Sequence, residues 1–251
     1  MNLTSSLNKD RFSNHAKQYA AFRPAYPKAI YDFIFGHVKN FDSAWDAGTG
    51  NGQVARDLAL RFKKVFATDI SEKQLANAAR AENIQYSIAG EDPNFPDSSF
   101  DLITIAQAIH WFDIPKFYNE VNRVGKKDAV IAVWGYGLLN IHPDIDKALQ
   151  NFYFNIVGPY WDKERRLIDE HYKTIPFPFE EIVTPAFHIS VDWTLPEFQG
   201  YLSTWSSVQK YIHANRVNPV GDFIKEIRPL WKSDRQKINF PLFLRLGKIS
   251  K

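Results

Sequence analysis

A chain of 251 residues with 45% hydrophobic side chains can bury one substantial core, which excludes disordered and fibrous proteins. The net charge of +3 comes from 31 basic and 28 acidic residues that are mixed along the chain, so no basic stripe for nucleic acid is expected. Because cysteine is absent, disulfides, thiolate metal sites and a catalytic thiol are excluded. No run of about 18 apolar residues occurs, so we expect no membrane span, no signal peptide and a cytoplasmic protein.

The first half of the chain alternates between helix-like and strand-like segments. Hydrophobic periodicity predicts, in chain order, a helix over 29–38, a strand over 43–46, a helix over 53–62, a strand over 65–69, a helix over 72–81, strands over 84–88 and 100–107, a helix over 114–124 and a strand over 129–134. Strands that alternate with helices at this spacing form βαβ units on a parallel sheet with right-handed crossovers.

The second half, after Gly137, has a mainly helical pattern. Helices are expected over 144–157, 164–172, 196–211 and 219–231, together with one strand over 188–193 and a closing strand. Open α/β folds bind ligands at the carboxyl ends of their strands, and we expect the helical half to cap that edge. We therefore predict a core over 29–136, a helical cap with one core strand over 137–237, and a final sheet strand over 238–251.

A glycine-rich loop follows the first predicted strand. Gly50-x-Gly52-x-x-Ala55 matches the relaxed dinucleotide-binding pattern, and Asp69 lies 19 positions after Gly50, where an acid that binds ribose is expected. NAD therefore stays an alternative on this pattern. Asp46, at the end of the first strand, would repel a pyrophosphate and attract a cation. S-adenosyl-L-methionine carries an ammonium and a sulfonium but no phosphate, so it suits this loop better.

The residues after the second strand favour a ligand with a ribose. Asp69 could cap the next helix, but Ser71 to Gln74 already form a capping-box pattern in which Ser71 is the cap. Asp69 is then left at the strand end, where its two oxygens can accept both hydroxyls of a ribose.

Five motifs occur in a fixed order along the core. They are Asp46-Ala-Gly-Thr-Gly-Asn-Gly52, Ala67-Thr-Asp69-Ile-Ser71, Gly90-Glu91-Asp92, Phe95-Pro-Asp-Ser-Ser-Phe-Asp-Leu102 and Ala106-Gln-Ala-Ile-His-Trp-Phe112. Together they resemble the class I S-adenosylmethionine-dependent methyltransferases, and in particular the type 11 small-molecule group that includes ubiquinone-biosynthesis and trans-aconitate methyltransferases. The resemblance covers the sheet from about residue 12 to residue 134, and residues 201–206 and 241–247 resemble one subgroup.

The resemblance implies an α/β fold and a set of cofactor-binding residues. The fold would be a Rossmann-like, seven-stranded, mostly parallel sheet whose last strand is antiparallel, with a helical cap and an amino-terminal lid over 1–28. The methionine moiety would be faced by Asp46, Gly48, Thr49 and Gly50. Asp69 would bind the ribose and Ile70 would cover the adenine, while Gly90 and Glu91 lie in the segment that contacts adenine and Gln107 borders the transferable methyl. The commonest family pattern has an acid two positions before Glu91, where this chain has Ala89.

The segments expected to hold the acceptor carry aromatic and basic residues. His110 could take a proton from an acceptor hydroxyl, or it could support the pocket through a hydrogen bond. Trp111, and Tyr19 in the lid, could attract the sulfonium through their aromatic faces or pack in the core. Arg23 could clamp an acceptor carboxylate or lie on the surface. Trp205 could form the cap wall of the pocket or a core contact.

The residues after the fourth strand bear on the class of acceptor. This chain has Gln-Ala-Ile-His at the position where amine-methylating relatives carry an Asn/Asp-Pro-Pro-Tyr/Phe signature. An oxygen acceptor, either a carboxylate or a hydroxyl, is therefore favoured over an amine, and a carbon acceptor stays an alternative. We predict a monomeric or homodimeric methyltransferase for a small molecule, with no metal, nucleic-acid or membrane partner. The alternatives are an NAD(P)-dependent oxidoreductase, a non-catalytic cofactor-binding protein of the same fold, and methylation of RNA or protein.

Overall fold

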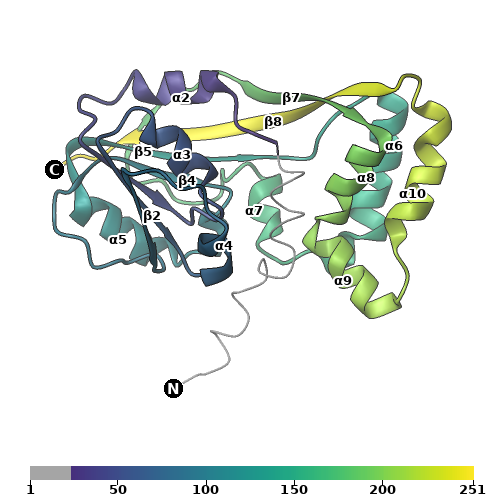
Figure 1. The fold of residues 1–251 in the computed structure, drawn as a ribbon, viewed down its shortest axis with the longest axis horizontal. Helices are drawn as coiled ribbons and strands as arrows, with labels where there is room; N and C mark the ends of the chain where they lie inside the picture. The colour runs from purple at the N-terminus through teal and green to yellow at the C-terminus, as the bar shows by residue number, and fades with distance from the viewer. Residues whose placement is uncertain (1–23) are drawn as a thin grey trace.

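The computed structural model describes residues 24–251, whose centre is a mixed eight-stranded sheet (Figure 1). The strand order is β3-β2-β1-β4-β5-β8-β6, and β7 pairs with β8 off this path. The strands are β1 Ser43–Ala47, β2 Lys64–Asp69, β3 Ile84–Ile88, β4 Phe100–Ala106, β5 Gly125–Tyr136, β6 Glu180–Ile182, β7 Phe187–Thr194 and β8 Arg235–Lys248. Strands β1 to β5 are parallel and β8 is antiparallel to β5, which confirms the expected mostly parallel sheet with an antiparallel last strand.

Helices cover both faces of the parallel strands. The core helices are α2 Lys28–Phe35, α3 Gln53–Ala59, α4 Glu72–Ala76 and α5 Ile114–Val124. Because side chains alternate along a strand, Ala44 of β1 packs in the cluster that holds α2 and α3, whereas its neighbour Trp45 packs in the cluster that holds α5. Burial on both faces explains why these strands read as continuous apolar runs in the sequence.

Strand β8 connects the core sheet to the cap. Its residues 242–248 pair with β5, and its residues 235–242 pair with β7. The β7–β8 ribbon therefore extends beyond the parallel strands and reaches the cap helices (Figure 1). Phe240 of this ribbon is fully buried, and its ring lies edge-on at 5.4 Å from both Tyr136 of the core and Tyr201 of the cap.

The cap gathers at the far end of the ribbon, and α7 lies between the cap and the core (Figure 1). The longer elements of the second half are α6 Pro143–Asn151, the π-helix η3 Phe152–Ile156, α7 Arg165–Asp169, α8 Leu195–Ser203, α9 Ser206–Asn215 and α10 Pro219–Ile227. The 3₁₀ turns are η2 Ile109–Trp111, η4 Gly158–Tyr160 and η5 Arg228–Leu230. Helix α8 begins with a complete capping box, in which Thr194 and Glu197 each accept a hydrogen bond from the other's backbone N–H.

The strand count and the start of the final strand differ from the sequence expectation. The sheet has eight strands rather than seven, because the long β8 pairs with both β7 and the short β6. The final strand also begins at Arg235, before the predicted 238, since β7 offers it a partner over that stretch. The lid predicted over 1–28 lies mostly outside the described residues.

Two predicted helices also need correction. The helix expected over 196–211 is two helices, α8 and α9, because the backbone at Trp205 is extended (φ −66°, ψ 132°) and its indole is buried among the cap's aromatic rings. The helix expected over 72–81 ends at Ala76, where the Asn77 side-chain amide donates to the Lys73 carbonyl at 2.8 Å. Tertiary burial of Trp205 thus divides the first of these helices, and local side-chain hydrogen bonding at Asn77 ends the second before the hydrophobic pattern does.

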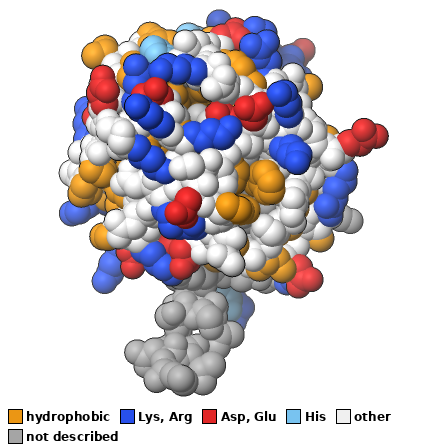
Figure 2. Space-filling view, turned by 90° about the vertical axis from the view of Figure 1, so that its left-hand side faces the viewer, with side chains coloured by type: hydrophobic (Ala, Val, Ile, Leu, Met, Phe, Trp, Pro, Cys, Tyr) orange, Lys and Arg blue, Asp and Glu red, His pale blue; other side chains and the backbone are white. Residues whose placement is uncertain are grey.

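The surface at the core end mixes the two signs of charge. Figure 2 shows this end with Lys and Arg side chains interspersed among Asp and Glu side chains and small apolar areas. On this face the charge distribution is that of a solvated surface rather than a basic stripe. No helix within residues 24–251 combines the length and the apolar character that crossing a membrane requires.

Replacing Phe240 tests how firmly the ribbon ties the cap to the core. We expect Phe240→Ala to lower the free energy of unfolding by about 3–5 kcal/mol, because it removes a large buried ring and leaves a cavity. Urea unfolding followed by tryptophan fluorescence measures this change. Phe154→Ala is the matched control, because 59% of Phe154 is exposed, and its effect should stay within about 0.5 kcal/mol. Equal effects of the two substitutions would contradict the assignment.

Candidate active site

A cavity of about 550 Å³ opens at the carboxyl ends of the parallel strands. Strands β1 to β4 end at Ala47, Asp69, Ile88 and Ala106, and the residues that follow each of them line the cavity. Pro24 and Tyr26 before α2, Tyr136 at the end of β5 and Glu164 just before α7 also line it. The cavity therefore lies at the edge of the sheet where open α/β folds bind ligands.

The glycine loop after β1 adopts a backbone that favours glycine. Gly48, Gly50 and Gly52 have φ of 67°, 57° and 76°, in the left-handed region. A Cβ on Gly48 would lie 2.5 Å from the Cβ of Ala108, and one on Gly52 would overlap the Tyr86 hydroxyl. The loop thus needs glycine both for its backbone conformation and for its close packing.

Asp46 is buried at the floor of the cavity. Only 1% of the residue is exposed, and its two carboxylate oxygens accept hydrogen bonds from the Thr49 hydroxyl at 2.5 Å and the Thr104 hydroxyl at 2.8 Å. Burial raises the pKa of Asp46 to about 7, although both hydrogen bonds favour the ionised form. A cation placed beside it would favour the ionised form further.

Asp69 joins the glycine loop to the start of α4. Its carboxylate accepts from the Gly50 N–H at 2.9 Å and from the Ser71 N–H at 2.8 Å. Ser71 in turn caps α4, since its hydroxyl accepts from the Gln74 N–H at 3.4 Å, as the capping-box pattern predicted. A carboxylate has about four acceptor positions, so these two backbone bonds are compatible with binding hydroxyl groups.

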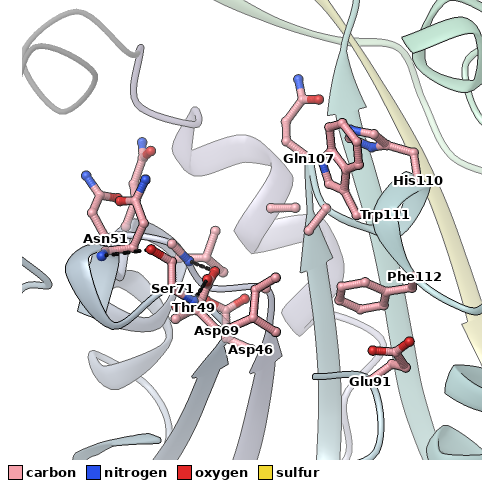
Figure 3. Close-up of a pocket in the computed structure, with 18 of the residues that line it drawn as sticks. Asp46, Thr49, Asn51, Asp69, Ser71, Glu91, Gln107, His110, Trp111 and Phe112 are labelled. Carbon is pink, nitrogen blue, oxygen red and sulfur yellow. Dashed lines mark hydrogen bonds between the residues drawn. The ribbon is translucent and has the colours of Figure 1, made fainter. Parts of the chain in front are cut away.

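The opposite wall of the cavity comes from the residues after β4. Figure 3 shows Gln107, Trp111 and Phe112 across the cavity from Asp46 and Asp69. Gln107 has an unusual left-handed backbone (φ 55°), and its side-chain amide donates to the Tyr136 carbonyl at 3.1 Å. Positive φ at a residue other than glycine is concentrated at functional sites, where the surrounding structure holds it in place.

His110 is held inside this wall by Tyr172. Its Nδ1 lies 2.9 Å from the Tyr172 hydroxyl, and 8% of the residue is exposed. Burial, and then the positive charge of Arg165, lower the pKa of His110 to about 3. The imidazole is therefore neutral throughout the physiological pH range and has a low affinity for a proton.

The rim of the cavity is formed by the residues after β2 and β3. Ile70 is 44% exposed, and its methyl group is the nearest neighbour that a Cβ on Gly90 would meet. Glu91 accepts a hydrogen bond from the Asp113 N–H at 3.3 Å, which ties this loop to the start of α5.

The cavity is acidic. Four acidic residues line it, namely Asp46, Asp69, Glu91 and Glu164, and the described lining contains no Lys or Arg. A pyrophosphate would be repelled by this set, whereas a cationic ligand would be attracted.

Several known proteins that this chain resembles in sequence and fold are assigned as methyltransferases. A model of the methyltransferase domain family matches residues 45–133. A Dictyostelium discoideum protein assigned as a methyltransferase is 32% identical over 249 residues, which are 95% of each chain. A Saccharomyces cerevisiae protein assigned as an S-adenosylmethionine-dependent methyltransferase is 26% identical over 95% of this chain and 94% of its own. A solved structure from Anaeromyxobacter dehalogenans, assigned as a type II methyltransferase, is 33% identical with a TM-score of 0.85 and covers 91% of this chain and 99% of that one.

The chain belongs to the class I S-adenosylmethionine-dependent methyltransferases. The alternative of an NAD(P)-dependent oxidoreductase is not favoured, since these relatives and the acidic cavity both point away from it. The narrower likeness to ubiquinone-biosynthesis and trans-aconitate enzymes stays a prediction.

The methyltransferase brings most of its predicted site residues together. The predicted cofactor-binding residues that line the cavity are Asp46, Gly48, Thr49, Gly50, Asp69, Ile70, Gly90, Glu91 and Gln107. His110 and Trp111 line it as well. Trp205 does not: it is buried in the cap, with ring centroids of Tyr153 and Trp161 both at 5.6 Å. Tyr19 and Arg23 lie outside the described residues.

Sequence reasoning missed several lining residues of the methyltransferase, among them Tyr136, Gln74 and Glu164. Tyr136 follows from the rule that strand ends line the site, once β5 is extended two residues beyond its predicted end. Gln74 lies in the predicted capping box, but nothing in that pattern shows that it also faces the cavity. Glu164 comes from the second half of the chain, and no motif marks it.

The raised pKa of Asp46 predicts a pH-dependent affinity of the methyltransferase for cationic ligands. Without ligand, Asp46 gains a proton as the pH falls through about 7, so a cation must then displace that proton to bind. We expect the dissociation constant of S-adenosyl-L-homocysteine to rise about eightfold from about pH 7.5 to about pH 6. Isothermal titration calorimetry in buffers of different ionisation enthalpy measures both the affinity and the proton released. An affinity that is constant over this range, with no proton release, would contradict the prediction.

Proposed function

We propose that this methyltransferase binds S-adenosyl-L-methionine in the cavity and transfers the methyl group to an oxygen atom, of a carboxylate or hydroxyl group, on a small molecule. The observation that carries the proposal is a cavity at the carboxyl edge of the sheet with four acidic residues and no Lys or Arg in its described lining. The cofactor has two cationic groups, an ammonium and a sulfonium, and one carboxylate. Such a ligand is attracted where a phosphate is repelled.

Individual residues have roles that suit their positions. Asp46 and the loop of Gly48 to Gly50 would hold the methionine moiety, with the missing side chains of the glycines giving clearance. Asp69 would accept hydrogen bonds from the ribose, and Ile70 would cover the adenine ring from the rim. Glu91 would contact the adenine from the loop after β3.

The bound cofactor supplies a methyl group on a sulfonium, which leaves by in-line displacement. The protein then has to exclude water and hold the acceptor oxygen in line. Trp111 and Phe112 present aromatic surface on the wall opposite the acids, where they can stabilise a cation and keep water out. Gln107, fixed through its bond to the Tyr136 carbonyl, would border the methyl group.

The low pKa of His110 favours an acceptor group that is already ionised. It is the one histidine in the described lining, its Nδ1 is engaged by Tyr172, and its pKa is lowered to about 3. A base of such low proton affinity removes a proton from a hydroxyl poorly. A carboxylate needs no base, so it fits this wall better than an alcohol does. The volume of about 550 Å³ is within the range of small-molecule sites.

Calorimetric titration with S-adenosyl-L-homocysteine and with NAD tests the cofactor. We expect the former to bind and the latter not to bind. Asp46→Asn should weaken S-adenosyl-L-homocysteine by more than about tenfold, because it removes the charge beside the ammonium. Asp42→Asn is the matched control: Asp42 precedes the opposite end of β1, where it pairs with Lys63 on the surface, and its loss should leave the affinity unchanged. Binding of NAD in preference would overturn the proposal.

Replacing His110 tests whether it supports the wall or accepts a proton. We expect His110→Ala to lower kcat by less than about 100-fold, the low end of general-base effects. We also expect no ionisation between about pH 5 and pH 8 in the kcat profile that the substitution removes, since the pKa of His110 is about 3. Tyr172→Phe should have a similar small effect, because it loosens the same ring. A larger loss with unchanged S-adenosyl-L-homocysteine affinity would show that His110 is a base.

A further inference from the structure

Arg165 lies at the boundary between the core and the cap. It is the first residue of α7, the short helix between these two parts (Figure 1). Helix α7 packs against η2, which contributes His110 and Trp111 to the cavity wall. The preceding residue, Glu164, lines the cavity directly. Arg165 itself is not among the described lining residues, so it lies directly behind the acidic cavity, at its cap side.

Several contacts hold the guanidinium in one place. Its Nε donates to the Tyr153 hydroxyl at 2.6 Å, and that hydroxyl donates to the Asp169 carboxylate at 2.7 Å. The guanidinium carbon also lies 4.8 Å from the ring centre of Trp161 and 5.4 Å from that of Tyr153. Aromatic faces and a fixed hydrogen bond hold the planar fork in one orientation, which reduces the entropy lost when it binds an anion.

The outer edge of the fork has no hydrogen-bond partner among the residues that the structure describes. Neither Nη nitrogen of Arg165 donates a hydrogen bond to any residue among 24–251. Both nitrogens keep access to solvent, because neither is one of the fully buried unpaired atoms of that part of the chain. The side chain keeps 21% of its surface exposed. Asp169 lies 3.5 Å from Nε, so the carboxylate that compensates the charge is on the other edge. Two parallel N–H donors left open in this way match the two oxygens of a carboxylate or phosphate.

The neighbouring Arg166 shows that an ion pair with an acid four residues on does not require a buried arginine. Arg166 also pairs with an acid four residues on, Glu170, but its side chain is 76% exposed. Arg165 makes the equivalent pair with Asp169 and is instead enclosed by aromatic rings. Partial burial of a guanidinium is costly unless partners offset the lost hydration, and the Tyr153 hydroxyl and the Asp169 carboxylate do so on the Nε edge. A ligand oxyanion would do the same on the open edge.

We propose that the outer edge of Arg165 binds a second acidic group of the methyl acceptor, a carboxylate or phosphate, at the cap end of the cavity. This inference rests on the proposed function, because it concerns the acceptor of that same reaction. The described lining of the cavity is acidic and would repel such a group, whereas Arg165 lies just beyond that lining, so Arg165 fixes which end of the acceptor faces the cap. The other end, with the oxygen to be methylated, is then directed toward the cofactor side.

A comparison of two neighbouring arginines tests the proposal. Methyl transfer is measured with glutaric, adipic and suberic acids, each paired with its monoamide, and with alkyl phosphates that carry a terminal carboxylate. We expect the wild type and Arg166→Gln to prefer the diacid or the phosphate over the monoamide. Arg165→Gln should raise KM for the doubly acidic compounds by about 10- to 100-fold, with little change in kcat or in S-adenosyl-L-homocysteine affinity. The phosphate and diacid arms show which oxyanion is preferred.

A second variant separates binding from folding. Arg165→Lys keeps the charge but loses the fork, so we expect an intermediate KM and wild-type thermal stability. An unchanged KM in Arg165→Gln, or a wild type that binds S-adenosyl-L-homocysteine but methylates only neutral compounds, would overturn the role of Arg165 and leave the proposed function intact. A wild type that fails to bind S-adenosyl-L-homocysteine would instead overturn the proposed function itself.

Discussion

The pairing of one long strand with two partners determines the shape of this enzyme. Strand β8 completes the core sheet beside β5 at one end and pairs with β7 at the other, so the cap is held in place by continuous backbone hydrogen bonds. Phe240 packs against Tyr136 and Tyr201 at the crossing between the two regions. The cap is fixed in this way, and α7 lies between it and the core, where the preceding residue Glu164 lines the cavity at the strand ends.

The charged side chains that line the cavity then determine which ligands it attracts. The strand ends and their loops contribute acidic residues, of which Asp46 is the most deeply buried. Burial raises the pKa of Asp46 to about 7 even though the two threonine hydroxyls favour its ionised form. A cofactor with two cationic groups would be attracted to this acidic cavity. Arg165 lies just beyond the described lining at the cap side, and the anion site that we propose there would bind a group of the opposite charge.

The loops that form the floor are held by hydrogen bonds between motifs that are far apart in the sequence. Asp69 accepts hydrogen bonds from the backbone N–H groups of Gly50 in the glycine loop and Ser71 at the start of α4. Glu91 accepts one from the backbone N–H of Asp113, the N-cap residue of α5. Asp69 and Glu91 therefore stabilise the loops of the site even without a ligand. We therefore expect replacement of these acids to change both the position of the loops and the charge of the cavity, whereas replacement of a remote carboxylate such as Asp42 should change neither.

The sequence by itself determined the parallel core and its ligand edge, because hydrophobic periodicity, the glycine loop and the caps are local properties of a few adjacent residues. The strand end at Asp69, the cap at Ser71 and the whole of α5 were predictable on that basis. Only the tertiary structure decided the eighth strand, the break at Trp205 and the positions of Glu164 and Arg165. These depend on β8 pairing with distant segments and on which surfaces are buried when the cap meets the core, and no short stretch of sequence contains that information.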